Sequence, residues 1–130
     1  MHPRARNLID TLALQPHPEG GWYRQIYKSA ETVTRHADGA NRTSLTAIYF
    51  LLDAKSVSRR HRVKSDEVWH FYEGDALELT IDAMPVILDA THRVHVVPAN
   101  VWQSARPLGA YTLVGCTVGP GFEFEDFEME

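Results

Sequence analysis

The sequence predicts an all-β fold, an antiparallel sandwich or barrel of short strands preceded by one short helix. From Thr43 onward, apolar and polar residues alternate with period two over most of the chain, which is typical of half-buried strands. Turn-forming Gly, Pro, Asn and Asp residues interrupt this alternation at short intervals, which indicates roughly nine or ten strands. A chain of 130 residues is long enough for a core of its own, so we expect a single domain over residues 1–130.

The N-terminal region is predicted to form a helix that leads into a strand. Apolar residues recur at helical spacing behind Pro3, so we expect an amphipathic helix at residues 4–14, ended by Pro16. The segment HPEGG at residues 17–21 cannot continue a helix, and we interpret it as a linker rather than a binding loop. Aromatic and polar residues then interleave over residues 22–28, which predicts the first strand.

The remaining strands follow a polar loop at residues 29–41. An apolar run at residues 44–52 is expected to be buried on both faces. The other strands are short and mostly alternate, and they are predicted at residues 57–63, 67–72, 77–82, 86–88, 93–97, 101–105 and 110–118. The barrel strands are therefore expected to occupy residues 22–118.

The formal net charge of −4 comes from the end of the chain, because residues 123–130 include five acidic side chains. The remaining chain is near neutral and lacks the broad basic face that nucleic-acid binding requires, so we expect no nucleic-acid partner. Phe122, Phe124 and Phe127 stand among these acids, and solvated tails are rarely so aromatic. We therefore expect part of the C-terminal segment, residues 122–130, to dock on the barrel.

The sequence also bears on the cellular compartment. No segment approaches the ~18 apolar residues of a membrane-spanning helix, and the N-terminus lacks the features of a secretory signal, so we expect no membrane partner. Cys116 is the only cysteine and lies in an apolar strand, which predicts a buried, inert thiol rather than a nucleophile. A single unpaired cysteine favours a reducing setting, and we expect a cytoplasmic protein.

Residues able to do chemistry concentrate in one predicted hairpin at residues 58–75, with His61 on its first strand and both Glu67 and His70 on its second. Alternate residues of a strand share a face, so Arg59 is expected to point with His61. By the same rule Glu67 and His70 face opposite sides, and they line one cavity only if a bulge intervenes. The other histidines have no partner pattern and are interpreted as incidental: His2, His17, His36, His92 and His95.

Two motifs of this chain resemble those of the cupin superfamily. His61, Glu67 and Gly74 have the spacing of the first cupin motif, and VPANVWQ at residues 97–103 resembles the second. With the blocks HPEGGWYRQIY, RTSLTAIYFLL and LVGCTVGPGFEFEDFE, the chain is similar to small single-domain cupins often described as predicted sugar epimerases. The resemblance implies a cupin jelly-roll β-barrel like that of the dTDP-sugar epimerases, and a homodimer with residues 22–28 at its interface.

The resemblance also shows two departures. Metal-binding cupins have further histidine ligands at the positions that are Val63 and Gln103 here. Valine cannot coordinate a metal, and an amide oxygen is a poor ligand for transition metals. We therefore expect no metal and no cofactor.

Acid–base chemistry does not need a metal. The resemblance implies isomerisation or epimerisation of a small polar ligand such as a sugar, a nucleotide-sugar or a small acid. His61 would be the base, Glu67 would orient it, and His70 or a tyrosine would be the acid. Ligand contacts are expected from polar and aromatic residues of the barrel mouth, namely Tyr49, Arg59, Tyr72, Trp102 and Gln103. The alternative is a non-catalytic cupin that binds a ligand without turnover.

Overall fold

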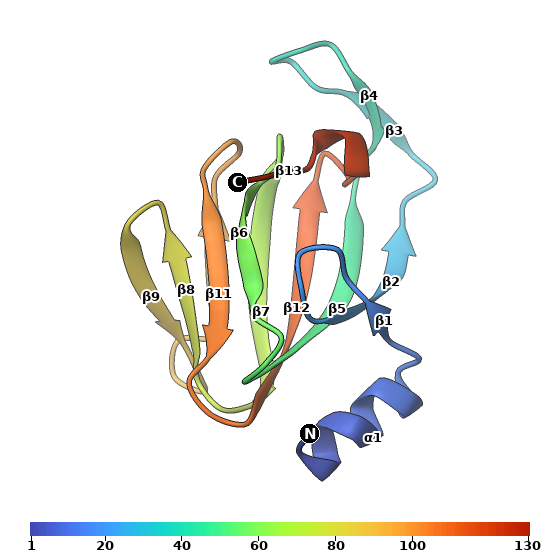
Figure 1. Ribbon diagram of the computed structural model, residues 1–130. Helices are drawn as coiled ribbons and strands as arrows, with labels where there is room; N and C mark the ends of the chain where they lie inside the picture. The colour runs from blue at the N-terminus through green and yellow to red at the C-terminus, as the bar shows by residue number, and fades with distance from the viewer.

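A computed structural model describes residues 1–130 and shows two antiparallel β-sheets packed face to face, with one α-helix outside them (Figure 1). This confirms the predicted all-β jelly roll with a short N-terminal helix. The larger sheet has six strands, in the spatial order β1 (Gln15–Pro16), β2 (Trp22–Lys28), β5 (Thr46–Asp53), β12 (Tyr111–Gly119), β7 (Asp66–Gly74) and β10 (Val94–Val97).

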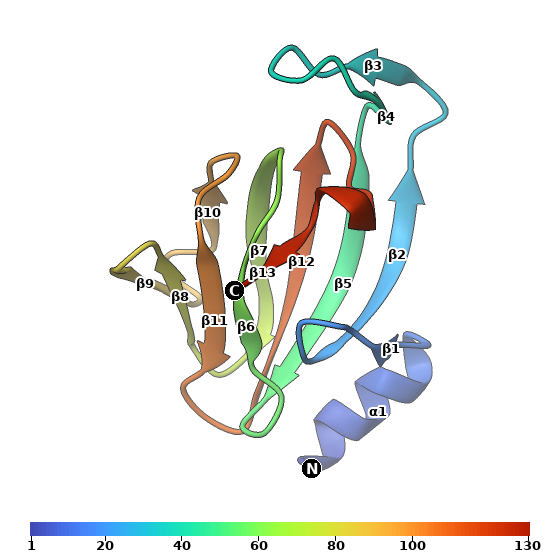
Figure 2. The ribbon, with the colours of Figure 1, turned by 45° about the horizontal axis from the view of Figure 1, so that its top comes forward.

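The second sheet has five strands, and a separate hairpin adds two more. The order across the second sheet is β13 (Glu128–Met129), β6 (Ser58–Arg62), β11 (Gln103–Pro107), β8 (Leu77–Ile81) and β9 (Met84–Leu88). The hairpin of β3 (Thr32–Thr34) and β4 (Asn41–Thr43) projects beyond the end of the larger sheet (Figure 2).

The main core lies between the two sheets. Every second side chain of each strand points into this space, because successive side chains of a strand face opposite sides. Trp69 of β7 and Phe50 of β5 are its largest members, and both are fully buried. The other members are Leu52, Phe71, Leu77, Leu79, Leu88, Val97, Ala105, Val114 and Cys116. The expected burial of Cys116 is thereby confirmed, since its side chain is 2% exposed.

The helix α1 (Pro3–Thr11) packs on the outer face of the larger sheet. Ala5 and Leu8 of its apolar stripe contact Leu51 and Leu113, which point out of the sandwich. The helix is shorter than predicted, because Ala13 adopts a positive φ of 53° that reverses the chain. No helix of the protein has the length and apolar character needed to cross a membrane.

The C-terminal segment docks on the barrel, as its phenylalanines predict. After a single 3-10 turn, η1 (Phe124–Asp126), strand β13 pairs antiparallel with β6. Asp126 is 5% exposed and accepts hydrogen bonds from Arg35 and Arg42, which belong to the hairpin region of β3 and β4. The Arg42 Nη2 to Asp126 Oδ1 distance is 2.8 Å, and the Arg35 Nη1 to Asp126 Oδ2 distance is 3.0 Å. This ion cluster joins the end of the chain to the hairpin.

The first prediction concerns this ion cluster. We expect Asp126→Asn to lower the free energy of unfolding by about 3 kcal/mol, because two guanidinium groups lose their buried counter-ion. Hydrogen bonds from Arg42 and Arg35 hold the pKa of Asp126 well below its usual range. The stabilisation is therefore present above the ordinary carboxyl pKa and is lost only as pH falls through the lower value of the folded protein.

Urea denaturation at pH 7 and at progressively lower pH measures this effect. The matched control is Glu125→Gln, because the Glu125 side chain is 73% exposed and pairs with the same Arg42. We expect that control to change stability by less than about 1 kcal/mol. Equal losses for the two variants would contradict a structural role for Asp126.

The second prediction concerns the edge of the larger sheet. Strand β1 pairs only with Trp22 and Tyr23, which leaves the rest of β2 without a neighbour on that side. Ile26 and Tyr27 on this stretch are 42% and 52% exposed. Because an open, apolar edge favours pairing with another strand, we expect a homodimer that buries Trp22–Lys28.

Light scattering at micromolar concentration tests the dimer. The double change Ile26→Glu and Tyr27→Lys is expected to yield a monomer. The control Met84→Glu alters an exposed residue of β9, at the edge of the other sheet, and is expected to leave the dimer intact. A monomeric mass for the unaltered chain would contradict this prediction.

Candidate functional site

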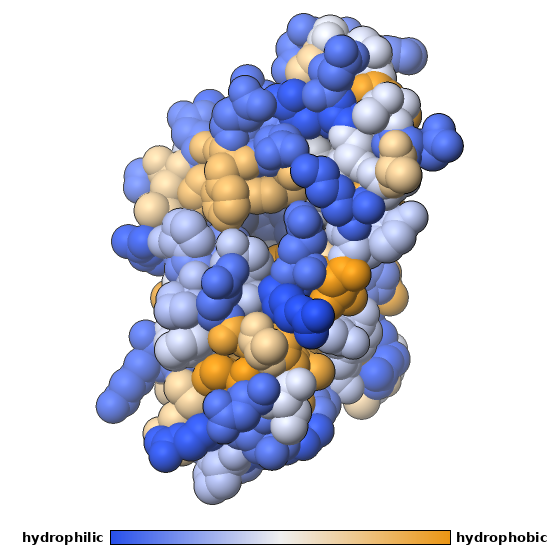
Figure 3. Space-filling view, turned by 90° about the vertical axis from the view of Figure 1, so that its right-hand side faces the viewer, coloured by the Kyte–Doolittle hydropathy of each residue, from blue (hydrophilic) through white to orange (hydrophobic).

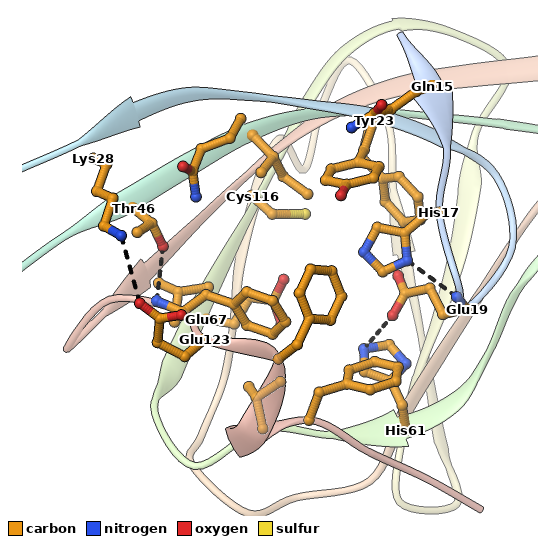
Figure 4. A pocket seen from close by; sticks show the side chains of 18 residues that line it. Gln15, His17, Glu19, Tyr23, Lys28, Thr46, His61, Glu67, Cys116 and Glu123 are labelled. Carbon is orange, nitrogen blue, oxygen red and sulfur yellow. Dashed lines mark hydrogen bonds and ion pairs between the residues drawn. The ribbon is translucent and has the colours of Figure 1, made fainter. Parts of the chain in front are cut away.

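A cavity of about 380 Å³ opens between the two sheets at the end covered by the C-terminal segment. The close-up in Figure 4 shows its side chains coming from β2, β5 and β12 on one side and from β6 and the C-terminal segment on the other. The lining residues are Gln15, His17, Glu19, Tyr23, Gln25, Lys28, Thr46, Ile48, Phe50, His61, Val63, Glu67, Cys116, Val118, Phe122, Glu123, Phe124 and Phe127. Figure 3 shows a hollow on the side of the molecule that carries β2, with both hydrophilic and hydrophobic side chains around it.

The turn between β1 and β2 brings a carboxylate into this cavity. Gly20 and Gly21 have φ angles of 109° and 81°, which only glycine adopts without strain. A Cβ on Gly20 would lie 2.0 Å from the carbonyl oxygen of Val57, so the turn can approach β6 only because the residue is glycine. The Arg59 amide donates to the Glu19 carbonyl at 2.9 Å. These constraints bury the Glu19 side chain against β6.

His61 and Glu19 form a buried ion pair in the cavity. The His61 Nε2 to Glu19 Oε2 distance is 2.9 Å, and the Ser58 hydroxyl donates to the other Glu19 oxygen at 2.9 Å. The second ring nitrogen of His61, Nδ1, lies 2.7 Å from the Arg59 carbonyl, which can only accept. Burial opposes the imidazolium, but the Glu19 hydrogen bond and charge, the Glu67 charge and the Arg59 carbonyl outweigh it. They raise the pKa of His61 to about 9. His61 is therefore a cation at neutral pH.

Glu67 is a second carboxyl group in the cavity, in a different environment. It is 7% exposed, and the Gln103 amide nitrogen donates to its Oε1 at 2.9 Å. The Gln103 oxygen in turn accepts a hydrogen bond from the Trp69 indole at 2.9 Å, which fixes the orientation of the amide. Burial raises the pKa of Glu67, and the charge of His61 lowers it less. Burial also raises the pKa of the Cys116 thiol, a further hydrogen-bond partner of Glu67, so the thiol stays protonated.

His17 completes the polar wall of the cavity. Its Nδ1 accepts a hydrogen bond from the Glu19 amide at 3.1 Å, so that nitrogen carries no proton. Burial lowers the pKa of His17, which keeps the ring neutral. The ring packs edge-on against Tyr23 with centroids 4.5 Å apart.

The structure brings three of the sequence-predicted site residues together. His61 and Glu67 line the cavity, and Gln103 lies directly behind Glu67, fully buried. Glu67 was expected to orient His61, but the carboxylate in contact with His61 is that of Glu19, which the sequence did not single out.

The other predicted site residues lie outside the cavity, on the outer surfaces of the sheets. His70 points away from Glu67 and contacts the Thr117 hydroxyl at 3.1 Å, on the outer face of the larger sheet. Its ring stacks with Tyr72, and Tyr72 contacts Tyr49 on the same face. A bulge does occur in β7, but it falls at Tyr72, beyond both Glu67 and His70. The two side chains therefore keep opposite orientations.

Arg59 and Trp102 are also outside. The pairing of β6 with β11 is bulged, so that two residues, Arg59 and Arg60, intervene between the inward-facing Ser58 and His61. Because of this shift, the expectation that Arg59 points inward with His61 was wrong. The Arg59 guanidinium instead donates to the carbonyl oxygens of Pro18 and Glu19. Trp102 lies under the Arg62 guanidinium, 4.5 Å from the ring centroid.

Sequence reasoning missed His17 and Glu19. HPEGG does connect two elements, β1 and β2, but it is more than the predicted linker, because its His17 and Glu19 side chains line the cavity. The double glycine was the available signal, since two adjacent glycines after an acidic residue permit a tight turn that folds back on a neighbouring strand.

The residues at the cupin metal positions do not fit a metal ion. Val63 has no donor atom, and both ends of the Gln103 amide are engaged by Glu67 and Trp69. Both nitrogens of His61 are likewise engaged, by Glu19 and by the Arg59 carbonyl. Nowhere in the chain do three His, Cys, Asp or Glu side chains group in a way that could hold a metal. Of the four cupin metal positions, only His61 and Glu67 carry residue types that transition metals favour, and two ligands are too few for a stable site.

Comparisons with known proteins agree with the fold. Residues 6–130 match the profile of a cupin superfamily family, DUF985. A hypothetical protein from Leishmania major has a similar structure at 30% identity, with a TM-score of 0.89 over 97% of this chain and 86% of that one. Protein SO0799 from Shewanella oneidensis is 32% identical, with a TM-score of 0.84 over 97% and 84% of the two chains.

More distant structures share the fold alone. An RmlC-like cupin from Shewanella frigidimarina is 15% identical, with a TM-score of 0.62 over 85% of each chain. A search of curated proteins found no match.

The third prediction concerns metal content. Because Val63, Gln103 and His61 offer no free set of ligands, we expect the purified protein to contain no stoichiometric transition metal. Elemental analysis after exposure to iron, manganese, nickel or zinc measures this directly. One metal ion per chain, lost in a His61→Asn variant, would overturn it.

The fourth prediction concerns the His61–Glu19 pair. The folded-state pKa of about 9 lies above the ordinary value of 6.5, so the pair stabilises fully below pH 6.5 and its contribution is lost as pH rises through 9. We expect His61→Asn to lower the free energy of unfolding by about 3 kcal/mol at pH 6, and by much less at pH 10.

Urea denaturation of both proteins across this pH range is the measurement. His92→Asn is the matched control, because the His92 ring is exposed and pairs only with His95. A destabilisation by His61→Asn that does not change with pH would show that the ion pair is not its cause.

Proposed function

The chain belongs to the cupin superfamily, and from its cavity we propose that it binds a small polar molecule and moves a proton on it, as an isomerase or epimerase. The observation that supports this most is a pair of carboxyl groups in one cavity with different environments, Glu19 and Glu67. Glu19 is paired with the His61 cation, whereas Glu67 is buried without a cationic partner in contact. Such differences in environment separate proton acceptors from proton donors.

The roles proposed here differ from those that the sequence alone suggested. His61 is protonated at neutral pH and has both ring nitrogens engaged, so it is a poor base in the resting site. We assign it instead the stabilisation of negative charge, both on Glu19 and on a ligand that ionises. Glu19 is the acceptor of a proton from the ligand, and Glu67, whose raised pKa favours the neutral form, is the donor.

A second function, binding without turnover, is favoured by a specific observation. In the resting site both oxygens of Glu19 already accept hydrogen bonds, from Ser58 and from His61. A group that is fully satisfied gives up part of its bonding to take a proton, whereas it can contact a ligand at no such cost. The aromatic walls of Tyr23, Phe124 and Phe127 suit ligand binding in either case.

The homodimer and the cytoplasmic location are further parts of this proposal. A homodimer through β2 would lie beside the cavity, because Tyr23, Gln25 and Lys28 of that strand line it. A cytoplasmic location stays a prediction from the single cysteine.

The fifth prediction tests turnover against binding alone. A thermal-shift screen of monosaccharides, nucleotide-sugars and small acids identifies ligands, since a ligand of the folded state raises the melting temperature. Each ligand is then incubated with the protein in deuterium oxide. We expect deuterium to enter the carbon next to a carbonyl group, as detected by NMR, at a rate reduced at least about 100-fold in Glu67→Gln.

The control for this experiment is Glu78→Gln, a half-buried glutamate of β8 that pairs with Arg106 outside the cavity, and this variant is expected to exchange at the normal rate. Binding without any exchange would decide in favour of the non-catalytic function. No melting shift with any compound would contradict a ligand-binding cavity of this class.

A further inference from the structure

Resting on the proposed function of the cavity, we propose that His17 is a further catalytic residue, whose Nε2–H donates a hydrogen bond to the carbonyl oxygen of the ligand. The ligand in this proposal is an uncharged hydroxy-aldehyde or hydroxy-ketone. Removal of a proton from the carbon beside a carbonyl group places negative charge on the oxygen, so a donor aimed at that oxygen speeds the step.

The His17 ring is held in one tautomer. Its Nδ1 accepts a hydrogen bond from the Glu19 amide at 3.1 Å, so the proton of the neutral ring is on Nε2. Nε2 is not enclosed by protein, because the Trp22 indole nitrogen is the only buried side-chain nitrogen or oxygen that lacks a partner. Figure 4 shows Nε2 directed toward the middle of the cavity. His17 therefore presents an N–H donor to the space that a ligand occupies.

The His17 ring is also fixed in position. The His17 amide donates to the Gly21 carbonyl at 2.9 Å, and the His17 carbonyl accepts from the Gly20 amide at 3.0 Å. The ring packs edge-on against Tyr23, with centroids 4.5 Å apart, and its centroid lies 5.4 Å from that of Phe50. A donor that is held in place before the ligand arrives needs no reorganisation as charge develops on the oxygen.

The two cations of the cavity are less suited to this hydrogen bond. Both ring nitrogens of His61 are engaged, by Glu19 and by the Arg59 carbonyl, so its charge acts on the ligand without a direct hydrogen bond. The Lys28 ammonium lies 3.5 Å from the Glu123 carboxylate. The free imidazole N–H belongs to the residue two positions before Glu19, in the same turn, so the donor and the proton acceptor are presented to the ligand together.

The charged side chains that line the cavity balance one another. Glu19 pairs with His61, and Glu123 lies beside Lys28. Burial raises the pKa of Glu67, so its neutral form is favoured. A ligand with a net charge would lose hydration in the cavity and find no free counter-ion there, whereas an uncharged ligand avoids this cost. The balance of charges therefore favours an uncharged ligand.

The remaining polar groups of the cavity suit hydroxyl groups. They are amide and hydroxyl side chains that can both donate and accept hydrogen bonds, namely those of Gln15, Tyr23 and Gln25. The cavity volume of about 380 Å³ is at the lower end of the range for ligand pockets. An uncharged compound of few carbon atoms, with several hydroxyl groups and one carbonyl group, matches this lining.

The proposed step conserves protons and electrons. The C–H bond beside the carbonyl group breaks, and its proton passes to the Glu19 carboxylate. The electron pair of that bond forms a C=C double bond, and the π pair of the carbonyl group moves to the oxygen, where the His17 N–H stabilises it. The carbon then takes the proton of Glu67 and the carbonyl group forms again. Proton exchange with water returns both carboxyl groups to their starting forms.

Two substitutions separate the roles of the two ring nitrogens. His17→Asn keeps an acceptor near the position of Nδ1 and removes the donor, whereas His17→Gln places an amide N–H near the position of Nε2. Deuterium exchange into D-xylulose and L-erythrulose, two uncharged hydroxy-ketones, is followed by NMR at pH 7. We expect His17→Asn to lower the rate about 100-fold and His17→Gln to retain it within about tenfold. The control His92→Asn alters an exposed histidine and is expected to exchange at the normal rate.

Infrared spectroscopy adds a readout that needs no turnover. L-erythrulose labelled with carbon-13 at its carbonyl group is bound to each protein, and the carbonyl stretch is recorded. We expect a lower frequency in the unaltered protein and in His17→Gln than in His17→Asn, because a hydrogen bond to the oxygen weakens the C=O bond. If His17→Asn fails to fold, the comparison is with L-erythrulose in water, and a bound frequency that is no lower overturns the proposal.

The outcomes separate this proposal from the proposed function. An unchanged rate in His17→Asn, or equal losses in both His17 variants, overturns the role of His17 and leaves the proposed function standing. A loss in Tyr23→Phe without one in His17→Asn does the same, because the donor is then the Tyr23 hydroxyl.

Binding of the two ketoses without exchange contradicts the proposed turnover, and only the lower carbonyl frequency in the unaltered protein then upholds His17 as the carbonyl contact. If neither ketose binds, the present proposal is overturned, whereas the proposed function fails only if the thermal-shift screen also finds no ligand.

Discussion

The buried ion pair between His61 and Glu19 is the interaction on which the candidate site depends. It joins the glycine turn before β2, which belongs to the larger sheet, to β6 of the smaller one. A charged pair at this depth is tolerated because Ser58 and the Arg59 carbonyl satisfy the remaining polar atoms. The same contact that ties the two sheets together therefore also holds a cation and a carboxylate at the wall of the cavity.

The C-terminal segment adds a second constraint, at the mouth of the cavity. Its phenylalanines form part of the lining, and its one buried carboxylate, Asp126, is held by two arginines of the β3–β4 region. In Figure 2 the C-terminal strand crosses in front of the larger sheet and ends beside β6. The cluster gives the hairpin a contact with the C-terminal segment, and the cavity gains an aromatic cover. Both depend on one cluster of charges that is shielded from solvent.

Gln103 shows how a fold can keep a motif position and change its use. In metal-binding cupins this position is a ligand, whereas here the amide donates to Glu67 and accepts from Trp69. An amide can do both at once because it has a donor and an acceptor end. The orientation of Glu67 is thereby determined by protein contacts alone, which suits a carboxyl group that acts on a ligand rather than on a metal.

Much of the fold could be predicted from the sequence, because it rests on local chemistry. Period-two alternation, turn residues and a proline-delimited apolar stripe are properties of neighbouring residues, and they indicated the strands, the helix and the sandwich. The aromatic content of the acidic end similarly indicated that it docks. The spacing of His61 and Glu67 identified two cavity residues, because the resemblance of that hairpin to a cupin motif includes their orientation.

What the sequence could not determine depends on pairing between distant segments. A bulge in β6 turns Arg59 outward. The bulge in β7 lies beyond His70 in the chain and therefore does not turn His70 inward. Either shift depends on the register against a partner strand far away in the chain. Glu19 became the partner of His61 only because Gly20 lets the turn approach β6 more closely than any side chain would permit. Alternation along a strand is set by its own backbone, but the residue that stands opposite a side chain in the cavity is set by tertiary packing alone.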